Sequence, residues 1–185
     1  RSVRLAGRLA QLHRGDESPN RTPSEMNEVK TPAPAAPKGR IRWWATTPMW
    51  VMHLLPFLAF FTGVPWWNWV LMGGLYVVRM FFITAGYHRY FAHRSFKTSR
   101  WFQFVLAWGG ASAAQKGPLW WAGHHRLHHR YVDTDRDAHT PIKGFWWSHI
   151  GWILSDLHDE TPTETIEDFA RYPELRFLNK YDWIP

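Results

Sequence analysis

The sequence of 185 residues contains no cysteine, which excludes disulfide bonds, thiolate zinc sites and a cysteine nucleophile. It also contains no internal repeat, no glycine-rich phosphate-binding loop and no G-x-S-x-G motif. Acidic residues are fewer than basic ones, 15 against 22, and the net charge is +7 with neutral histidines. Such a charge suits an anionic partner, whether lipid headgroups, phosphate groups or nucleic acid.

Tryptophan, by contrast, is strongly over-represented, with 14 residues. Because the indole ring is apolar with a single polar N–H, this excess is typical of aromatic girdles at a membrane surface. The mean hydropathy is nevertheless negative. A polar N-terminal stretch and an acidic C-terminal stretch dilute a strongly apolar middle, so the average does not exclude a membrane protein.

The first 41 residues show no sustained apolar periodicity and include the Pro/Ala linker "TPAPAAPKGR". No apolar segment follows the N-terminal charges, so a signal peptide is not predicted. We expect residues 1–41 to form a disordered leader. Residues 1–25 precede the first methionine, Met26, and are interpreted as upstream read-through or a fragment end. The folded domain is expected over residues 42–185.

Two apolar segments, residues 43–63 and 66–86, each have about the 20 residues that a helix needs to cross the hydrocarbon core of a bilayer. The short "VP" join predicts a tight transmembrane hairpin, with a kink at Pro56. His53 and Arg79 are costly in lipid and are expected to face protein or to snorkel.

Basic residues flank both outer ends of this hairpin, whereas its turn carries no charge. The positive-inside rule therefore predicts that both ends are cytoplasmic. The shorter apolar segments 101–114 and 144–154 are expected to form interfacial or core helices. The predicted fold class is an all-α membrane protein, in which a transmembrane helical hairpin carries cytosolic and interfacial helices. The flanking basic residues are Lys38, Arg40, Arg42, Arg89, Arg94, Lys97 and Arg100.

Histidines gather in two motifs: "HRYFAH", with His88 and His93, and "HHRLHH", at positions 124, 125, 128 and 129. On a helix, His125 lies about 60° from His128 and about 40° from His129 around the axis, so all three are expected to project from one face. His88 and His93 are about 140° apart on an ideal α-helix, and they converge only if the helix frays, bulges or ends between them.

An imidazole-rich set without thiolates suits iron, copper, nickel or zinc. Five good candidate ligands exceed the four of a structural zinc site, which favours two metal ions over one. Three acidic residues downstream of the second motif are predicted to hydrogen-bond ligand imidazoles and to fix their tautomers. These are Asp133, Asp135 and Asp137, and His124 and His139 are reserve candidates at the same site.

The second motif also has two readings that involve no metal. Arg126 and Arg130 alternate with its histidines, so a basic patch for RNA or lipid is one alternative, and chance clustering is the second. The tryptophans fit interface and core positions better than ligand stacking. The isolated histidines are interpreted as ordinary surface or capping residues; they are His13, His53, His149 and His158.

The segments "HRYFAHRSF" and "QKGPLWWAGHHRLHHRYVDTDRDAHTP" resemble the first and second histidine boxes of the membrane-bound acyl-CoA (stearoyl-CoA type, Δ9) fatty acid desaturases, most closely the bacterial members. The box spacings, His-x4-His and His-x2-His-His, both match. "GFWWSHIGWIL" and "DFARYPELRFLNKY" are also similar to that family. The resemblance covers residue 42 to the C-terminus.

The resemblance implies a di-iron enzyme that uses O₂ and two electrons to place a cis double bond in a saturated acyl chain. The implied fold has four transmembrane helices under a cytosolic cap. The substrate would be a fatty acyl-CoA or acyl-lipid, and the electron donor would be a protein such as ferredoxin or cytochrome b5. The enzyme would lie in the bacterial inner membrane rather than in the endoplasmic reticulum. Nucleic acid is not an expected partner. The implied iron ligands are His88, His93, His125, His128 and His129, and Trp121 is the implied acyl-tunnel residue.

The family has a third box of the form His-x2-His-His, and nothing after His139 has that spacing. We therefore expect the chain to be an N-terminal fragment, holding half of the four-span fold and inactive by itself. The main alternatives are a related membrane hydroxylase or alkane monooxygenase, a non-catalytic membrane fragment, and a basic interfacial binding module. Removal of hydrogen from an unactivated methylene requires a redox-active metal, which favours iron over zinc.

Overall fold

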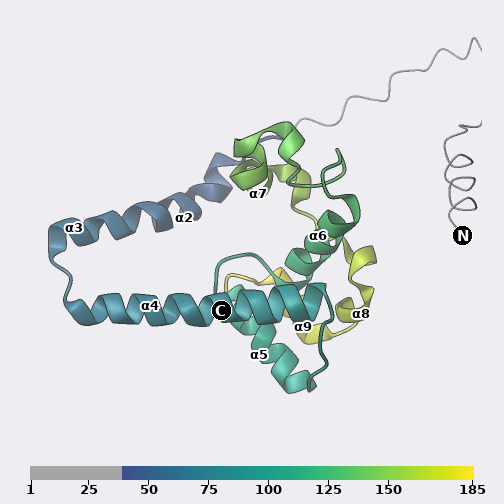
Figure 1. Cartoon of the computed structure of the whole chain (residues 1–185), viewed down its shortest axis with the longest axis horizontal. Coiled ribbons are helices and arrows are strands. Elements are labelled where there is room, and N and C mark those ends of the chain that lie inside the picture. The colour runs from purple at the N-terminus through teal and green to yellow at the C-terminus, as the bar shows by residue number, and fades with distance from the viewer. Residues whose placement is uncertain (1–38) are drawn as a thin grey trace, which may run out of the picture. The chain divides into compact units, whose positions relative to one another are not determined.

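The structure is a computed structural model that describes residues 39–185, apart from the side chain of Ala45. The predicted disordered leader, residues 1–41, lies almost entirely outside the described residues. Within them the chain is helical, and the only strand-like pairing is an isolated antiparallel bridge between Ile41 and Ser155. The prediction of an all-α fold is confirmed for this part of the chain (Figure 1).

The first apolar segment is helical but broken into three elements. They are α2 (Trp43–Leu54), the 3₁₀ turn η1 (Leu55–Leu58) and α3 (Ala59–Thr62). The 3₁₀ turn contains Pro56, which has no N–H to donate to the α-helical ladder. The α-helical pattern is therefore interrupted at the proline for which a kink was predicted. Gly63 follows with φ +64°, a left-handed conformation that glycine adopts without strain, and it ends the segment.

The second apolar segment is a continuous helix, Trp66–Ala92, of 27 residues. It consists of α4 (Trp66–Phe81) followed by a π-helix, η2 (Phe82–Ala92), so it extends six residues beyond the predicted end at residue 86. Among the described residues it is the one helix long and apolar enough to cross a membrane. In Figure 1 the α4 part extends away from α5, α6 and the C-terminal helices toward α3, and most of its side chains are exposed.

The π-helix η2 packs against α5 (Arg100–Ala111) and α6 (Pro118–Tyr131). Glycines permit the close approach of α5, because a Cβ atom at Gly109 would overlap the ring of Phe82 and one at Gly110 would overlap the ring of Tyr87. At the start of α5, the Ser99 side chain accepts a hydrogen bond from the Phe102 amide, as expected of a helix N-cap.

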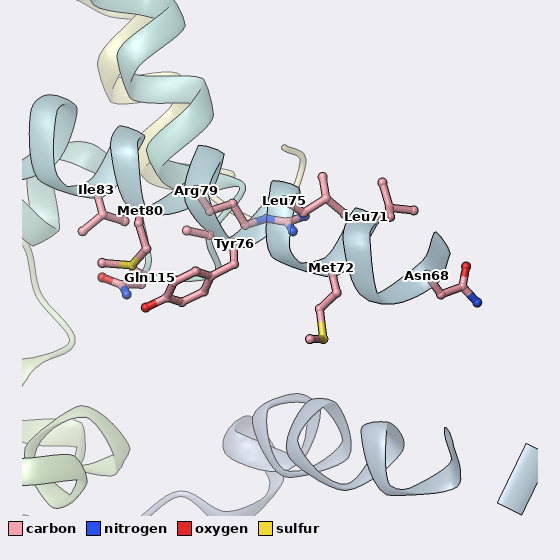
Figure 2. Close-up of a pocket in the computed structure, with 10 residues that line it drawn as sticks. Asn68, Leu71, Met72, Leu75, Tyr76, Arg79, Met80, Ile83 and Gln115 are labelled. Carbon is pink, nitrogen blue, oxygen red and sulfur yellow. The ribbon is translucent and has the colours of Figure 1, made fainter. Parts of the chain in front are cut away.

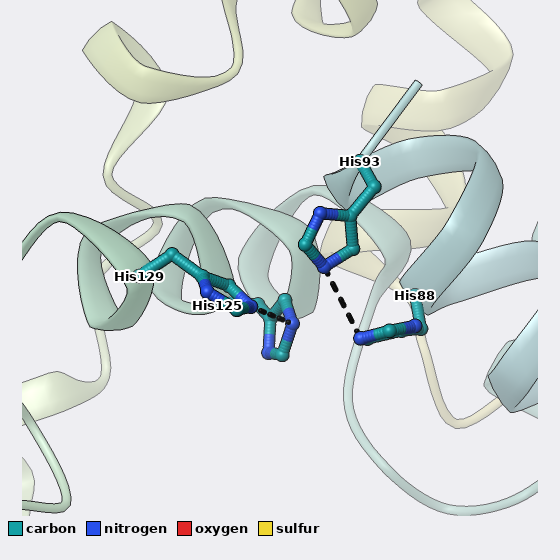
Figure 3. Close-up of side chains that lie close together, drawn as sticks. All are labelled: His88, His93, His125 and His129. Carbon is teal, nitrogen blue, oxygen red and sulfur yellow. Dashed lines mark hydrogen bonds between the residues drawn. The ribbon is translucent and has the colours of Figure 1, made fainter. Parts of the chain in front are cut away.

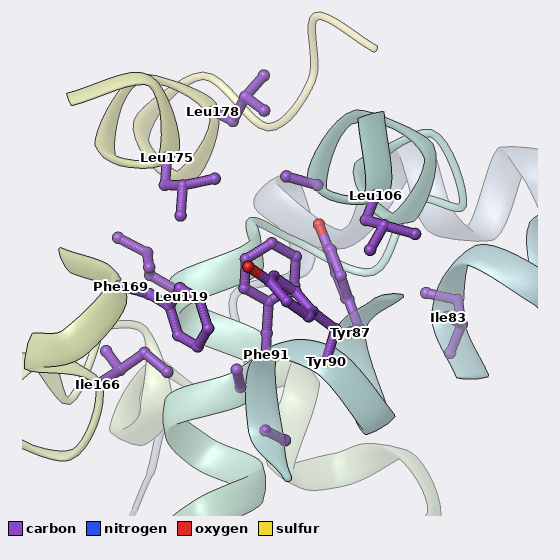
Figure 4. Close-up of a cluster of buried hydrophobic side chains, with 13 residues drawn as sticks. Ile83, Tyr87, Tyr90, Phe91, Leu106, Leu119, Ile166, Phe169, Leu175 and Leu178 are labelled. Atoms are coloured by element: carbon purple, nitrogen blue, oxygen red, sulfur yellow. The ribbon is translucent and has the colours of Figure 1, made fainter. Parts of the chain in front are cut away.

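Short elements follow α6, and the last of them pack on the core beside η2. They are η3 (Pro141–Lys143), η4 (Trp147–Gly151), α7 (Trp152–Leu154), η5 (Asp156–His158), η6 (Thr163–Thr165), α8 (Glu167–Ala170) and α9 (Pro173–Lys180). The amphipathic helix α9 buries Leu175 and Leu178 completely. Figure 4 shows these leucines facing Leu119, Phe91 and Tyr87, so the hydrophobic core lies between η2, α6 and the C-terminal helices. This core holds the two histidine-bearing helices against each other.

Candidate metal centre

The π-helix brings the histidines of the first motif together. In η2 the backbone amide of His93 donates to the carbonyl of His88, five residues earlier, over 3.0 Å. This i→i+5 pattern stacks residues that an α-helix would point about 140° apart. The Nε2 atoms of His88 and His93 consequently lie 3.2 Å apart. The bulge that their convergence requires is present in the structure.

The helix α6 supplies the second pair. His125 and His129 are one turn apart, and their Nε2 atoms lie 3.0 Å from each other. The two pairs face one another: ring centroids are 4.7 Å apart for His88 and His125, and 4.6 Å apart for His93 and His129. Figure 3 shows all four rings turned toward one small volume between η2 and α6. One nitrogen from each histidine lies within 4.8 Å of the others.

This donor set fits a first-row transition-metal ion. Imidazole nitrogens bind such ions at about 2.1 Å, so two ligands at 90–110° to each other are about 3.0–3.4 Å apart. The observed Nε2–Nε2 distances of 3.0 and 3.2 Å fall in this range. His93 and His129 are exposed and His88 and His125 are partly buried, so one side of this four-histidine group is open.

His125 and His129 are held in the neutral form that a metal requires. Burial, together with the neighbouring rings of His129 and His88, lowers the pKa of His125 to about 3. Burial and the nearby His93 lower the pKa of His129 as well. Each ring therefore carries one unprotonated nitrogen at neutral pH, which is the form that binds a metal ion.

The middle histidine of the second motif, His128, belongs to a different group. Its Nδ1 donates to the Oδ2 atom of Asp137 over 3.0 Å, and its ring stacks on His139 with centroids 4.0 Å apart. Asp137 is buried, which opposes its ionisation, but hydrogen bonds from His128 and from the His139 amide outweigh burial and lower its pKa. The three residues offer donor atoms within 4.8 Å of one another. Helical spacing predicted that His128 would converge with His125 and His129. Its hydrogen bond to Asp137 instead places it in a second group with His139.

The other predicted site residues are placed as follows. Trp121 stacks on the His125 ring, with centroids 4.8 Å apart and planes 22° apart. His124 is buried on another side of α6, where it packs on Trp120, so it contacts neither histidine group directly. Asp133 is exposed and forms no hydrogen bond or ion pair with any described residue. Asp135 is likewise exposed.

Two contributors were not predicted in their observed roles. His139 was predicted only as a reserve metal ligand. The sequence feature that indicated it was the surplus of histidines in and after the second motif. Gln115 was not predicted at all: its Oε1 atom accepts a hydrogen bond from the Trp121 indole over 3.1 Å. No sequence pattern marks this glutamine, because the contact depends on the loop between α5 and α6.

Gln115 also lines an open groove of about 500 Å³ along α4. The groove walls are largely apolar, and Figure 2 shows Met72, Tyr76 and Met80 projecting from the helix into it. Arg79 lies at the groove and donates through Nε to the carbonyl of Ser112 at the end of α5 over 3.1 Å. Gln115, at the edge of the groove, contacts Trp121, which in turn stacks on His125 of the four-histidine group.

Comparison with known proteins places these features in a family. The sequence model of the fatty acid desaturase family matches residues 65–184, which include both histidine motifs. The chain belongs to the fatty acid desaturase family. The resemblance of the two histidine boxes to desaturases is thereby confirmed at the level of the family.

Several desaturases share substantial identity with the chain. The sn-1 stearoyl-lipid 9-desaturase of Anabaena variabilis is 48% identical over 101 residues, which cover 54% of this chain and 37% of that protein. The delta-9 acyl-lipid desaturase 2 of Arabidopsis thaliana is 33% identical over 174 residues, covering 85% of this chain and 56% of that protein. An acyl-CoA 5-desaturase of Anemone leveillei is 34% identical over the same length. The chain thus spans between about a quarter and just over half of the length of the relatives it matches.

Proposed function

We propose that this chain forms part of a membrane-embedded desaturase that places a cis double bond in a saturated fatty acyl chain, with O₂ and two electrons as co-substrates. The observation that carries the proposal is the convergence of four imidazoles from η2 and α6 on one small volume. Family membership supports the same reaction class.

The proposed cofactor is a pair of iron ions. His88, His93, His125 and His129 would hold one ion, and His128 would contribute to the second, with His139 beside it. When bound, iron supplies the redox chemistry that removes hydrogen from an unactivated methylene. The hydrogen bond from Nδ1 of His128 to Asp137 fixes the tautomer that leaves Nε2 free to bind a metal.

The proposed acyl-chain site is the groove along α4. Its volume of about 500 Å³ and its apolar walls suit a hydrocarbon chain. Trp121 stands between the groove and the four-histidine group, because it bonds Gln115 on one side and stacks on His125 on the other. In this arrangement the indole would shield the metal ligands from water and lie behind Gln115 at the inner end of the acyl site.

The proposed membrane topology is the helical hairpin of residues 43–63 and 66–86, with both ends and the histidines at the cytoplasmic face. The two arms approach each other near the turn, where Phe57 and Phe60 line a second cavity with Trp69 and Met72. Large exposed apolar side chains along α2, α3 and α4 supply the surface that lipid would cover. We propose a bacterial inner membrane as the location.

The carrier of the acyl chain is proposed to be a membrane lipid. The sequence motifs indicated the acyl-CoA type, but most of the similar relatives are named as lipid or acyl-lipid desaturases. The Anemone leveillei relative is named as an acyl-CoA enzyme, so acyl-CoA is the alternative carrier. The exposed basic residues around the histidine groups would suit an acidic electron donor such as ferredoxin or cytochrome b5.

A chimera tests the proposed reaction. Residues 65–184 replace the matching segment of the Anabaena variabilis desaturase in a host supplied with saturated fatty acids, and the products are analysed by mass spectrometry. We expect monounsaturated chains, found first in lipid rather than in acyl-CoA. His125→Ala should abolish them, while His149→Ala, which changes an exposed histidine outside both groups, should not.

Hydroxylated products would contradict the desaturase proposal and support the related hydroxylase. A basic binding module predicts something different for the chain by itself. Under that alternative, replacing His125 and His128 by alanine would leave binding to lipid vesicles intact. Under the metal-site proposal, the same substitutions would abolish metal uptake.

A further inference from the structure

Arg126 occupies an unusual position for a basic residue of the second motif. It follows His125 directly on α6, yet its side chain is only 12% exposed. A surface patch for RNA or lipid would need an accessible guanidinium, so this residue does not serve such a patch. Its hydrogen bonds point inward, toward η2 and the C-terminal elements.

The Arg126 guanidinium makes five hydrogen bonds, which match its five N–H donors. Two go to the end of the π-helix: Nε to the Ala92 carbonyl over 3.0 Å and Nη2 to the Phe91 carbonyl over 2.6 Å. The other three go to the Thr165 carbonyl over 2.8 Å and to both carboxylate oxygens of Asp168 over 2.8 and 3.1 Å.

These contacts lie next to the metal-binding side chains. Phe91 and Ala92 immediately precede His93, and their carbonyls belong to the C-terminal turn of η2, where a helix leaves such groups without intrahelical partners. The same arginine adjoins His125. The Arg126 guanidinium therefore joins the backbone just before His93, in the first motif, to α6, the helix that carries the second motif.

We propose that Arg126 is a positioning residue that fixes the distance and orientation between the two histidine motifs, and so sets the geometry of the four-histidine group. Metal sites need ligands held to within about 0.5 Å of the productive geometry. The ring centroids of His93 and His129, which come from different helices, are 4.6 Å apart, so a small shift of η2 along α6 would separate them. This inference rests on the proposed metal site.

The test uses the whole chain in detergent micelles with Co²⁺ as the probe. Arg126→Lys keeps the charge but replaces the rigid fork by an ammonium that cannot reach five acceptors. We expect the dissociation constant for Co²⁺ to rise about ten- to a hundredfold, as when partners of metal ligands are removed elsewhere, and the visible ligand-field spectrum to change. Circular dichroism of the metal-free chain checks that the helices remain.

Arg100→Lys is the matched control. Arg100 also makes a two-point contact, with Glu174 over 2.6 and 2.8 Å, but this pair joins α5 to α9 and Arg100 is 62% exposed. Its loss should leave both the affinity for Co²⁺ and the spectrum unchanged.

A second pair of variants decides the question where Arg126→Lys does not fold. Asp168→Asn removes the carboxylate that orients the Arg126 fork, whereas Arg94→Gln removes only the exposed partner of Asp168, 3.0 Å away. We expect Asp168→Asn to bind Co²⁺ more weakly than the wild-type chain, and Arg94→Gln to bind it with wild-type affinity.

The inference would be overturned if folded Arg126→Lys kept the wild-type affinity for Co²⁺ and the wild-type spectrum. If Arg126→Lys does not fold, wild-type affinity and spectrum in Asp168→Asn would overturn it. A wild-type chain that binds no Co²⁺ would instead overturn the metal site itself, which separates the two failures.

Discussion

The Nε2 atoms of His88 and His93 lie 3.2 Å apart although the two residues are five positions apart along a helix. The π-helical hydrogen bond between their backbones makes this possible, because it stacks residues that an α-helix would turn away from each other. The pair faces His125 and His129 across the contact between η2 and α6. The four-histidine group therefore depends on a helix distortion as well as on the sequence motifs.

The packing that supports this distortion can be tested at Gly110. In Gly110→Ala the new methyl group would overlap the ring of Tyr87, whose hydroxyl donates to the Lys116 carbonyl over 2.9 Å and which precedes His88. Overpacking of this kind costs about 1–3 kcal/mol, so the unfolding midpoint in denaturant should fall. The matched control is Gly73→Ala on α4, where a Cβ atom would meet nothing within 4 Å. Equal midpoints for both variants would show that the close approach of α5 does not matter.

Two aspartates that the sequence did not distinguish are expected to behave differently. Asp137 accepts a hydrogen bond from His128, and Asp133 contacts neither histidine group. Asp137→Asn should weaken metal binding at His128 by about ten- to a hundredfold, since the amide no longer favours the correct tautomer. Asp133→Asn should have no effect, because asparagine tolerates the left-handed backbone at this position, φ +58°. Isothermal titration of both variants checks this, and equal affinities would contradict the assigned role of Asp137.

His124 is one of the buried histidines through which the stability of the metal-free chain should fall in acid. Burial is the main cause that lowers the pKa of this ring to about 4, against about 6.5 in an unfolded chain. Between these values the unfolded state binds more protons, so the stabilisation is complete above about pH 6.5 and is lost as the pH falls toward 4. The loss amounts to roughly 3 kcal/mol at most.

Thermal unfolding between pH 7.5 and 4.5 measures this dependence. His124→Asn, which cannot titrate in that range, should show a shallower decline than the wild-type chain. Parallel curves for the two proteins would mean that protonation of His124 does not limit stability.

Part of the site follows from sequence spacing alone. The i, i+4 relation of His125 and His129 places them on one face of any α-helix, and the structure has them 3.0 Å apart at Nε2. The position of His128 could not be predicted in this way. Its direction depends on Asp137, nine positions later, which the turn after α6 brings back beside this helix. Non-local contacts of this kind leave no periodic signal.

The fold shows the same division. The Pro56 break and the two apolar segments follow from backbone chemistry and length. The π-helix does not, because no local residue preference specifies an i→i+5 ladder; here η2 packs closely on the glycines of α5. The five hydrogen bonds of Arg126 could not be predicted from the sequence either, because its partners lie more than 30 residues away along the chain.

X-ray absorption spectroscopy of the iron-loaded chain tests the central claim most directly. We predict imidazole nitrogens as the nearest neighbours of iron, at about 2.1 Å. The number of imidazole neighbours per iron should fall when His88 and His125 are both replaced by alanine, because the first of the two metal groups then loses half of its ligands, and it should stay unchanged in His149→Ala. Failure of the wild-type chain to bind iron, or an unchanged spectrum in the double variant, would contradict the account.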